Sequence, residues 1–207
     1  MSSAQRSLID GPVGKIEVLL ENPAVPATGV VAVCCHPHPL YGGTLQNKVV
    51  HALSRAALDA GVPAVRFNFR GVGASEGSHD AGLGEVDDAL AVAEWAQAST
   101  GCSRLWSMGF SFGAFIAFQL AARRAAERLV TVAPPVQRFD FTRLAVPGCP
   151  WLVVQGDRDD LVNHELVDAW TRGLPVSPRV LMFEGADHFF HGRISELRRA
   201  VGDWLSS

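Results

Sequence analysis

The sequence predicts an α/β fold in which helices cover both faces of a mostly parallel, twisted sheet. Short β-branched runs alternate along the 207 residues with segments whose apolar residues recur every three or four positions. Several of the short runs are apolar at every position, as strands of a parallel sheet are when helices cover both of its faces. We therefore expect a buried central sheet whose connections are mostly helices.

The N-terminal segment "SLIDGPVGKIEVLLE" predicts an antiparallel hairpin at the edge of this sheet. Its "DGPVG" is a turn signal between two short strand-like runs. Further along the chain, six runs predict the remaining strands: "GVVAVCC", "VPAVRFNF", "RLWSMG", "RLVTVA", "WLVVQG" and "RVLMFEG".

Helical periodicity follows several of these runs. One stripe of apolar residues starts at Leu45 and ends before Gly61, a residue type common just past a helix end. A second stripe lies between residues 86 and 96, and a third segment, "FGAFIAFQLAAR", is apolar at most of its positions. The last stripe runs from Ile194 to Leu205.

Composition excludes several classes of protein. Hydrophobic residues make up 48% of the chain and charged residues 19%, which is typical of a globular protein. The net charge of −3 gives no basic surface for nucleic acid. No uninterrupted apolar stretch approaches the 18 residues of a membrane span, and the start has no signal-peptide pattern. We therefore expect a cytoplasmic protein without nucleic-acid or membrane partners.

The four cysteines show no pattern of a metal or redox site, and nothing in the sequence divides the chain into domains. No C-x-x-C pattern occurs, and Cys34 and Cys35 are adjacent in a predicted strand, so their side chains point to opposite faces. We interpret them as small buried hydrophobes in a reducing compartment. No repeat or long linker divides the chain, so we expect one domain over residues 1–207. The oligomeric state stays open.

A candidate nucleophile lies in "SMGFSFGA", where Ser111 stands between Gly109 and Gly113. The segment before it is strand-like and the segment after it is helical. A serine on a sharp strand-to-helix turn needs small residues two places before and after it, because strand and helix approach closely there. The alternative is an ordinary N-cap serine at a helix start.

A base and an acid follow in the order that this topology requires. His188 lies in "EGADHFFHG" after the last predicted strand, and we predict that it is the general base; His191 is the alternative. The loop "GDRDDLV" offers three carboxylates, Asp157, Asp159 and Asp160, as the orienting acid. Both loops follow parallel strands at the edge where ligands usually bind.

Together these motifs resemble the α/β-hydrolase family over nearly the whole chain. "GDRDDLV" resembles the family's Gly-x-x-Asp-x-x-Val acid loop, which implies that the acid is Asp159. "HPHPLYGGT", "NFRGVGASEG" and "GADHFFHG" resemble small bacterial serine hydrolases without a lid. The resemblance implies a Ser111–His188–Asp159 triad, no cofactor and no cap domain. Only 17 residues, 134–150, separate the strands between which the family inserts its cap.

The oxyanion loop departs from the family pattern, because Pro37 replaces the usual glycine after the first histidine. The first oxyanion donor is expected to be the N–H of Phe112, directly after the nucleophile. Aligned on His36, the second donor is the N–H of His38; a frame shifted to the next His-Pro pair gives Leu40. The prolines themselves cannot donate.

Other functions also fit these residues. The pair His36 and His38 also fits a metal site, although H-x-H at a strand end is typical of a longer barrel fold. A binding module without catalysis, a lyase or a cofactor-free peroxidation can use the same fold.

Acidic residues near the second helix are interpreted as structural, namely Glu76, Glu85, Asp87 and Asp88. Four phenylalanines flank the site loops and form either core or an acyl wall: Phe139, Phe141, Phe189 and Phe190.

The sequence thus predicts a serine hydrolase that acts on a small-molecule acyl substrate, an ester or thioester. Neither a metal nor a cofactor is expected.

Overall fold

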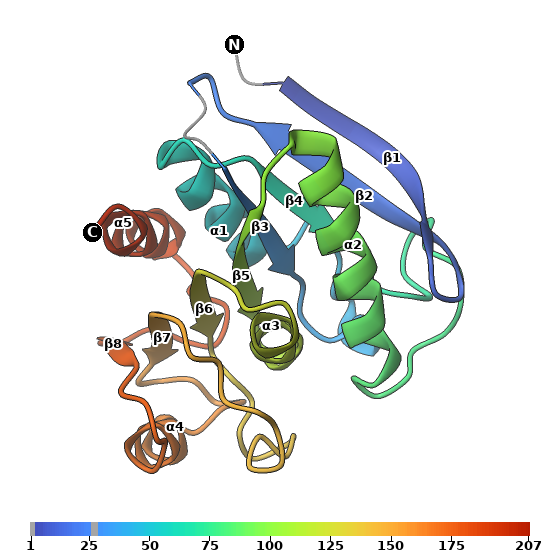
Figure 1. The fold of residues 1–207 in the computed structure, drawn as a ribbon. Helices are drawn as coiled ribbons and strands as arrows, with labels where there is room; N and C mark the ends of the chain where they lie inside the picture. Colours follow the sequence, from blue (N-terminus) through green and yellow to red (C-terminus); the bar gives the residue numbers. More distant parts are fainter. Residues whose placement is uncertain (1–2, 26–28) are drawn as a thin grey trace.

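The computed structural model describes residues 3–25 and 29–207. The strands of this part of the chain form an eight-stranded sheet in the order β1-β2-β4-β3-β5-β6-β7-β8 (Figure 1). Their bounds are β1 (Ser3–Gly11), β2 (Gly14–Asn22), β3 (Val30–Cys35), β4 (Ala64–Phe67), β5 (Arg104–Phe110), β6 (Arg128–Val132), β7 (Trp151–Gly156) and β8 (Arg179–Phe183).

The first two strands form the predicted antiparallel hairpin, and β1 is the edge strand. β2 also pairs antiparallel with β4, whereas every pair from β4 to β8 is parallel. The mostly parallel sheet and the edge hairpin are therefore confirmed. The carboxyl ends of β3, β5, β7 and β8 share one edge of the sheet, because these strands all run in the same direction.

The described residues also form five α-helices and one short 3₁₀ helix. They are η1 (Pro39–Tyr41), α1 (Lys48–Asp59), α2 (Gly84–Thr100), α3 (Phe112–Arg123), α4 (His164–Arg172) and α5 (Ile194–Leu205). The predicted helices α1, α2, α3 and α5 are confirmed, and α1 ends before Gly61 as expected. The sequence analysis did not identify α4, which buries only Val167 and Thr171.

The helices lie on both faces of the sheet (Figure 1). One apolar core joins the sheet to α2, α3 and α4, and the other joins it to α1 and α5. Cys35 belongs to the first core and Cys34 to the second, so the two thiols lie on opposite faces as predicted. Burial raises the pKa of the Cys34 thiol to about 12, which makes it an unreactive small hydrophobe.

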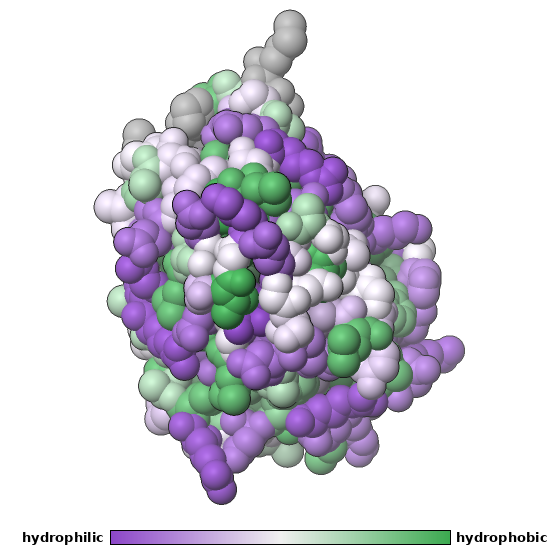
Figure 2. Space-filling view, turned by 90° about the vertical axis from the view of Figure 1, so that its right-hand side faces the viewer, coloured by the Kyte–Doolittle hydropathy of each residue, from purple (hydrophilic) through white to green (hydrophobic). Residues whose placement is uncertain are grey.

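The connection between β6 and β7 contains turns but no helix, so no cap domain is inserted there. No helix of the described residues is long and apolar enough to cross a bilayer. On the molecular face in Figure 2, hydrophobic residues appear in small groups bordered by hydrophilic ones.

Candidate active site

Ser111 occupies a strained turn between β5 and α3. Its backbone has φ 54° and ψ −121°, which lies outside the regions that side chains usually favour. A side chain at Gly109 would overlap the backbone of Gly113, and one at Gly113 would overlap the carbonyls of Cys35 and His36. Both glycines are therefore required by close backbone approach. The turn leaves Ser111 half-buried at the sheet edge.

His188 and Asp159 lie next to this serine. The Nε2 atom of His188 is 3.1 Å from Ser111 Oγ, and its Nδ1 atom is 2.7 Å from Asp159 Oδ2. The side chain of His188 is 3% exposed and that of Asp159 is fully buried. With Nδ1–H donating to the carboxylate, Nε2 is free to accept the serine proton.

Four donors hold the Asp159 carboxylate. Oδ1 accepts the N–H groups of Leu161 at 2.9 Å and Val162 at 2.7 Å. Oδ2 accepts the amide of Gln155 at 3.0 Å as well as the His188 ring. The sequence analysis missed Gln155, whose only signal was a polar side chain at the end of a buried strand. These bonds fix the carboxylate without any contribution from substrate.

The alternative acids, Asp157 and Asp160, and the alternative base, His191, have other partners or are exposed to solvent. Asp157 accepts the N–H of Gly185 at 2.6 Å, and Asp160 is exposed. His191 is also exposed, and its Nδ1 lies 2.6 Å from Asp187 Oδ2. The geometry therefore brings together Ser111, His188 and Asp159 and leaves these three alternatives outside the group.

Two backbone N–H groups near Ser111 correspond to the expected oxyanion donors. Phe112 is the first residue of α3, and a residue at this position has no acceptor within its own helix. Among the described residues, the N–H of His38 also meets no acceptor. The N–H of Leu40, by contrast, donates to the His38 ring at 3.3 Å. This contact favours His38 over Leu40 as the second donor.

The buried His36 ring holds the strand end that leads to His38. Its Nε2 accepts the N–H of Phe69 at 3.1 Å, so Nδ1 carries the proton and donates to the carbonyl of Pro37 at 2.6 Å. Burial lowers the pKa of His36 to about 4, so the ring is neutral at pH 7. Because the backbone engages both ring nitrogens, His36 has no lone pair left for a metal.

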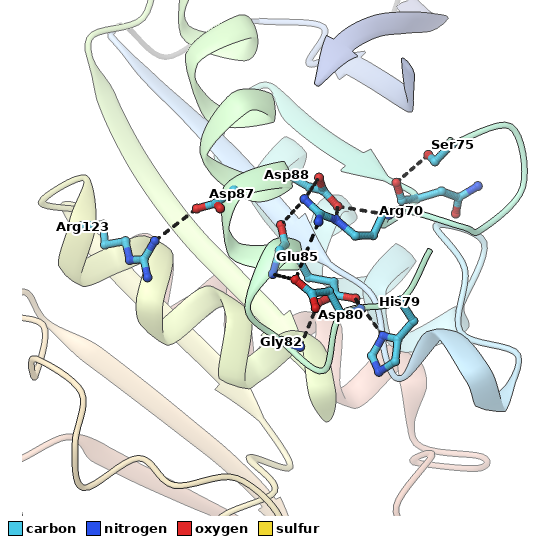
Figure 3. Close-up of polar contacts among 11 residues, drawn as sticks. Arg70, Ser75, His79, Asp80, Gly82, Glu85, Asp87, Asp88 and Arg123 are labelled. Atoms are coloured by element: carbon cyan, nitrogen blue, oxygen red, sulfur yellow. Dashed lines mark hydrogen bonds and ion pairs between the residues drawn. The ribbon is translucent and has the colours of Figure 1, made fainter. Parts of the chain in front are cut away.

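His38 contacts His79, which belongs to a polar network between β4 and α2; Figure 3 shows His79 and the rest of that network. The His38 ring lies 4.8 Å from that of His79, whose Nδ1 is 2.7 Å from the buried Glu85 carboxylate. Glu85 also accepts the N–H groups of Asp80 and Gly82, each at 2.8 Å. Burial is the main cause that lowers the pKa of His38, and a positive charge on His79 would lower it further.

The rest of this network fixes the loop that carries His79. Arg70 donates to the buried Asp88 carboxylate at 2.9 and 2.8 Å (Figure 3). Asp87 pairs with Arg123 of α3. Glu76 accepts the backbone N–H of Lys15 at 2.6 Å. The acidic residues of this region therefore make the structural contacts expected of them.

A cavity of about 430 Å³ opens above Ser111. Its wall includes apolar side chains, the site residues and one guanidinium: Pro37, His38, Tyr41, Gly42, Gly43, Asn47, Ser111, Phe112, Pro135, Arg138, Phe139, Leu161, Val162, His188 and Phe189. Of the four phenylalanines considered in the sequence, Phe139 and Phe189 line the cavity. Phe141 and Phe190 are buried in the two cores. Arg138 was not identified from the sequence.

No group of three or more histidine, cysteine, aspartate or glutamate side chains in the described chain is arranged to hold a metal ion. The series of contacts from Asp159 through His188 to Ser111, at the carboxyl edge of a mostly parallel sheet, is an arrangement typical of serine hydrolases.

Solved structures of similar sequence agree with this class. An α/β serine hydrolase homologue from Coxiella burnetii is 43% identical, with a TM-score of 0.93 and coverage of 97% of both chains. A serine hydrolase without a lid from Xanthomonas campestris is 40% identical, with a TM-score of 0.93 over 98% of this chain and 94% of that one. The fold is thus that of the α/β serine hydrolases without a lid.

An uncharacterised protein of Rickettsia prowazekii is 37% identical over 95% of this chain and 86% of its own. The family model described as X-Pro dipeptidyl-peptidase (S15 family) matches residues 22–149, more than half of the chain. The protein belongs to this family of hydrolases. The matched region includes Ser111 but ends before Asp159 and His188.

Proposed function

We propose that the protein is a serine hydrolase that cleaves small acyl esters or thioesters through an acyl-enzyme intermediate. The observation that carries this proposal is the contact series from Asp159 through His188 to Ser111, at 2.7 and 3.1 Å, beneath an open cavity. A serine with this base in place can attack an acyl carbonyl, whereas a serine without one is a weak nucleophile.

In the proposed mechanism, Ser111 Oγ attacks the acyl carbonyl carbon while His188 Nε2 takes the hydroxyl proton. The N–H groups of Phe112 and His38 donate to the oxyanion that forms. His188 then gives its proton to the departing alcohol or thiol, and the acyl group stays on Ser111. A water molecule, deprotonated by His188, attacks this ester; the bond to Ser111 Oγ then breaks, His188 returns the proton to Oγ, and the acid is released. Asp159 keeps the His188 ring oriented and stabilises its charged form.

The family name raises peptide cleavage as a second candidate. A dipeptidyl-peptidase must bind the free ammonium group of its substrate, and a carboxylate is the usual partner for such a group. No Asp or Glu occurs among the described residues that line the cavity, and Arg138 adds a positive charge to its wall. This lining favours acyl esters over peptides with a free N-terminus.

The test combines covalent labelling with a substrate panel. A fluorophosphonate should add once, to Ser111, and peptide mapping identifies the labelled residue. We expect hydrolysis of p-nitrophenyl butyrate and a butyryl thioester, lost in Ser111→Ala, and far slower cleavage of Gly-Pro-p-nitroanilide. A chelator should not change the rates.

Four results would contradict the proposal. Label on another serine, or esterase activity that persists in Ser111→Ala, would show a different nucleophile. Preferred cleavage of the dipeptide anilide would favour the peptidase reading. Labelling of Ser111 without hydrolysis of any acyl substrate would point to another reaction on the same fold.

A further inference from the structure

One cationic side chain stands on the cavity wall without an ionic partner. Arg138 lies in the connection between β6 and β7, and it is exposed. Among the described residues its guanidinium forms no ion pair or hydrogen bond with any other side chain. Most of the other arginines form ion pairs or hydrogen bonds. Examples are the ion pairs of Arg66, Arg70, Arg123 and Arg198.

The nearest acidic residue in the sequence has other partners. Asp140 Oδ1 accepts the N–H of Thr142 at 2.9 Å and its hydroxyl at 2.5 Å. Asp140 Oδ2 pairs with Arg143 at 3.1 Å. These bonds direct the Asp140 carboxylate toward the residues that follow it, so the charge of Arg138 is not neutralised within its own loop.

The backbone that carries Arg138 is fixed on both sides. Gln137 donates its side-chain amide to the carbonyl of Leu161 at 2.8 Å, which ties this loop to the acid loop. Phe139 stacks on Phe115 of α3, with ring centroids 4.6 Å apart and an interplanar angle of 27°. The N–H of Arg138 itself donates to Pro135 at 2.9 Å. These contacts hold the turn that carries Arg138 against the acid loop and α3, at the wall of the cavity.

The electrostatic effect of Arg138 reaches the oxyanion loop. Burial is the largest cause of the lowered pKa of His38, a charge on His79 is the second, and the positive charge of Arg138 lowers it in the same direction by a smaller amount. Because no carboxylate lines the cavity among the described residues, the wall offers one positive charge and no negative one. A substrate with a single negative charge matches this arrangement, and a cationic substrate does not.

We propose that the substrate carries a carboxylate, in addition to its ester or thioester, and that Arg138 binds this carboxylate. The inference rests on the proposed function. A guanidinium matches the geometry of a carboxylate, with two parallel N–H···O bonds. One guanidinium balances the single charge of a carboxylate, whereas phosphate sites usually combine several donors. Arg138 is therefore assigned as a specificity-determining residue.

Matched substrate pairs test the proposal on both sides of the scissile bond. The first pair is 4-acetoxybenzoate and 4-acetoxybenzamide, which differ in charge on the alcohol side. The second is p-nitrophenyl 4-carboxybenzoate and its 4-carbamoyl analogue, which differ on the acyl side. In both acids the para carboxylate cannot reach its own ester. The measured quantity is the ratio of kcat/KM for the anionic over the neutral member of each pair.

In the wild-type protein we expect this ratio to exceed one for at least one pair. Arg138→Gln should lower it about tenfold, equivalent to about 1.4 kcal/mol. Arg138→Lys should retain part of the preference, and Arg138→Glu should reverse it. The control is Arg143→Gln, an exposed arginine of the same loop that lies outside the cavity wall, which should leave the ratio unchanged. Raising NaCl to about 0.5 M should lower the wild-type ratio, because salt screens exposed charges.

A wild-type ratio of one or less for both pairs would overturn the inference. A ratio that does not respond to Arg138→Gln would do the same. If Arg138→Gln does not fold, Arg138→Lys and the salt series on the wild-type protein decide the question. Failure of the proposed function would look different, because neither member of either pair would then be hydrolysed by way of Ser111.

Discussion

Replacing His36 tests how the oxyanion loop keeps its shape. The carbonyl of Pro37, which accepts the Nδ1–H of His36 at 2.6 Å, belongs to the same planar peptide as the N–H of His38. The imidazole therefore sets the direction of the proposed second oxyanion donor. His36→Asn retains an amide N–H near the Nδ1 position, whereas His36→Gln retains an acceptor near Nε2 for the N–H of Phe69.

The two variants should separate activity from stability. Each leaves one buried polar group unpaired, so each should lower the free energy of unfolding by about 1–3 kcal/mol. Their kcat values should differ, because only His36→Gln loses the bond to Pro37. Complete removal of an oxyanion donor costs about 10² to 10³ in kcat, so a misdirected donor should cost somewhat less. We expect kcat of His36→Gln to fall at least about tenfold below that of His36→Asn.

The wild-type protein should also lose stability in acid through this residue. The folded chain binds a proton at His36 only near pH 4, whereas the unfolded chain does so near the ordinary pKa of 6.5. Between these values the unfolded state holds more protons, so stability falls as the pH is lowered, by about 3 kcal/mol in total. Above pH 6.5 His36 is neutral in both the folded and the unfolded chain, so its contribution to stability no longer changes with pH. Both variants should lack this dependence.

Urea unfolding from pH 4 to 8 and kcat with p-nitrophenyl butyrate measure these effects. Circular dichroism must first show that each variant is folded. Equal kcat values for the two variants would refute the role of the Pro37 contact. An unchanged acid dependence of stability in both variants would refute the assignment of that dependence to His36.

Two further predictions concern the acid and the acyl group. Asp159→Asn should lower kcat by about 10⁴, the effect of losing the orienting carboxylate of a triad, whereas Asp157→Asn and Asp160→Asn should cost far less. Steady-state kinetics of the three variants checks this, and a larger loss in Asp160→Asn would move the acid by one residue. The rate for p-nitrophenyl esters should peak between acetate and hexanoate and fall for laurate, because each CH₂ adds about 0.8 kcal/mol only while cavity wall covers it. An optimum at palmitate, or a jump in rate above the solubility limit, would reveal a deep acyl channel.

Local patterns were sufficient to predict most of the fold. Strand runs with apolar residues on both faces and helical stripes of three or four turns are each specified by neighbouring residues. Ser111 was predictable for the same reason, because the strand, the turn and the helix that it needs are contiguous. The helix α4 was missed since its nine residues bury only two side chains, which gives a weak periodic signal.

Long-range contacts decide what the sequence left open. The acid loop holds three carboxylates within four residues, and the family resemblance implied Asp159. The structure distinguishes Asp159 from its neighbours by a long-range contact, because His188, which follows another strand, lies 2.7 Å from it. The contact between the His38 ring and the N–H of Leu40 depends on the path of η1. Arg138 belongs to no sequence motif, so the sequence could not identify it. Its position on the cavity wall follows from the stacking of Phe139 on Phe115 and from the hydrogen bond of Gln137 to Leu161.

The absence of a cap makes these buried contacts more important. A lid excludes water when it closes and so strengthens every electrostatic interaction inside a site. Here the connection between β6 and β7 has no helix to close over Ser111, so the site must keep its geometry while solvent is present. Asp159 is fully buried behind His188, held by two backbone N–H groups and Gln155. His36 holds the opposite side of the site in the same way, through groups that water does not reach. The orientation of the reacting groups is thus fixed from beneath the sheet edge, which leaves the cavity above Ser111 free to admit and release substrate without a conformational step.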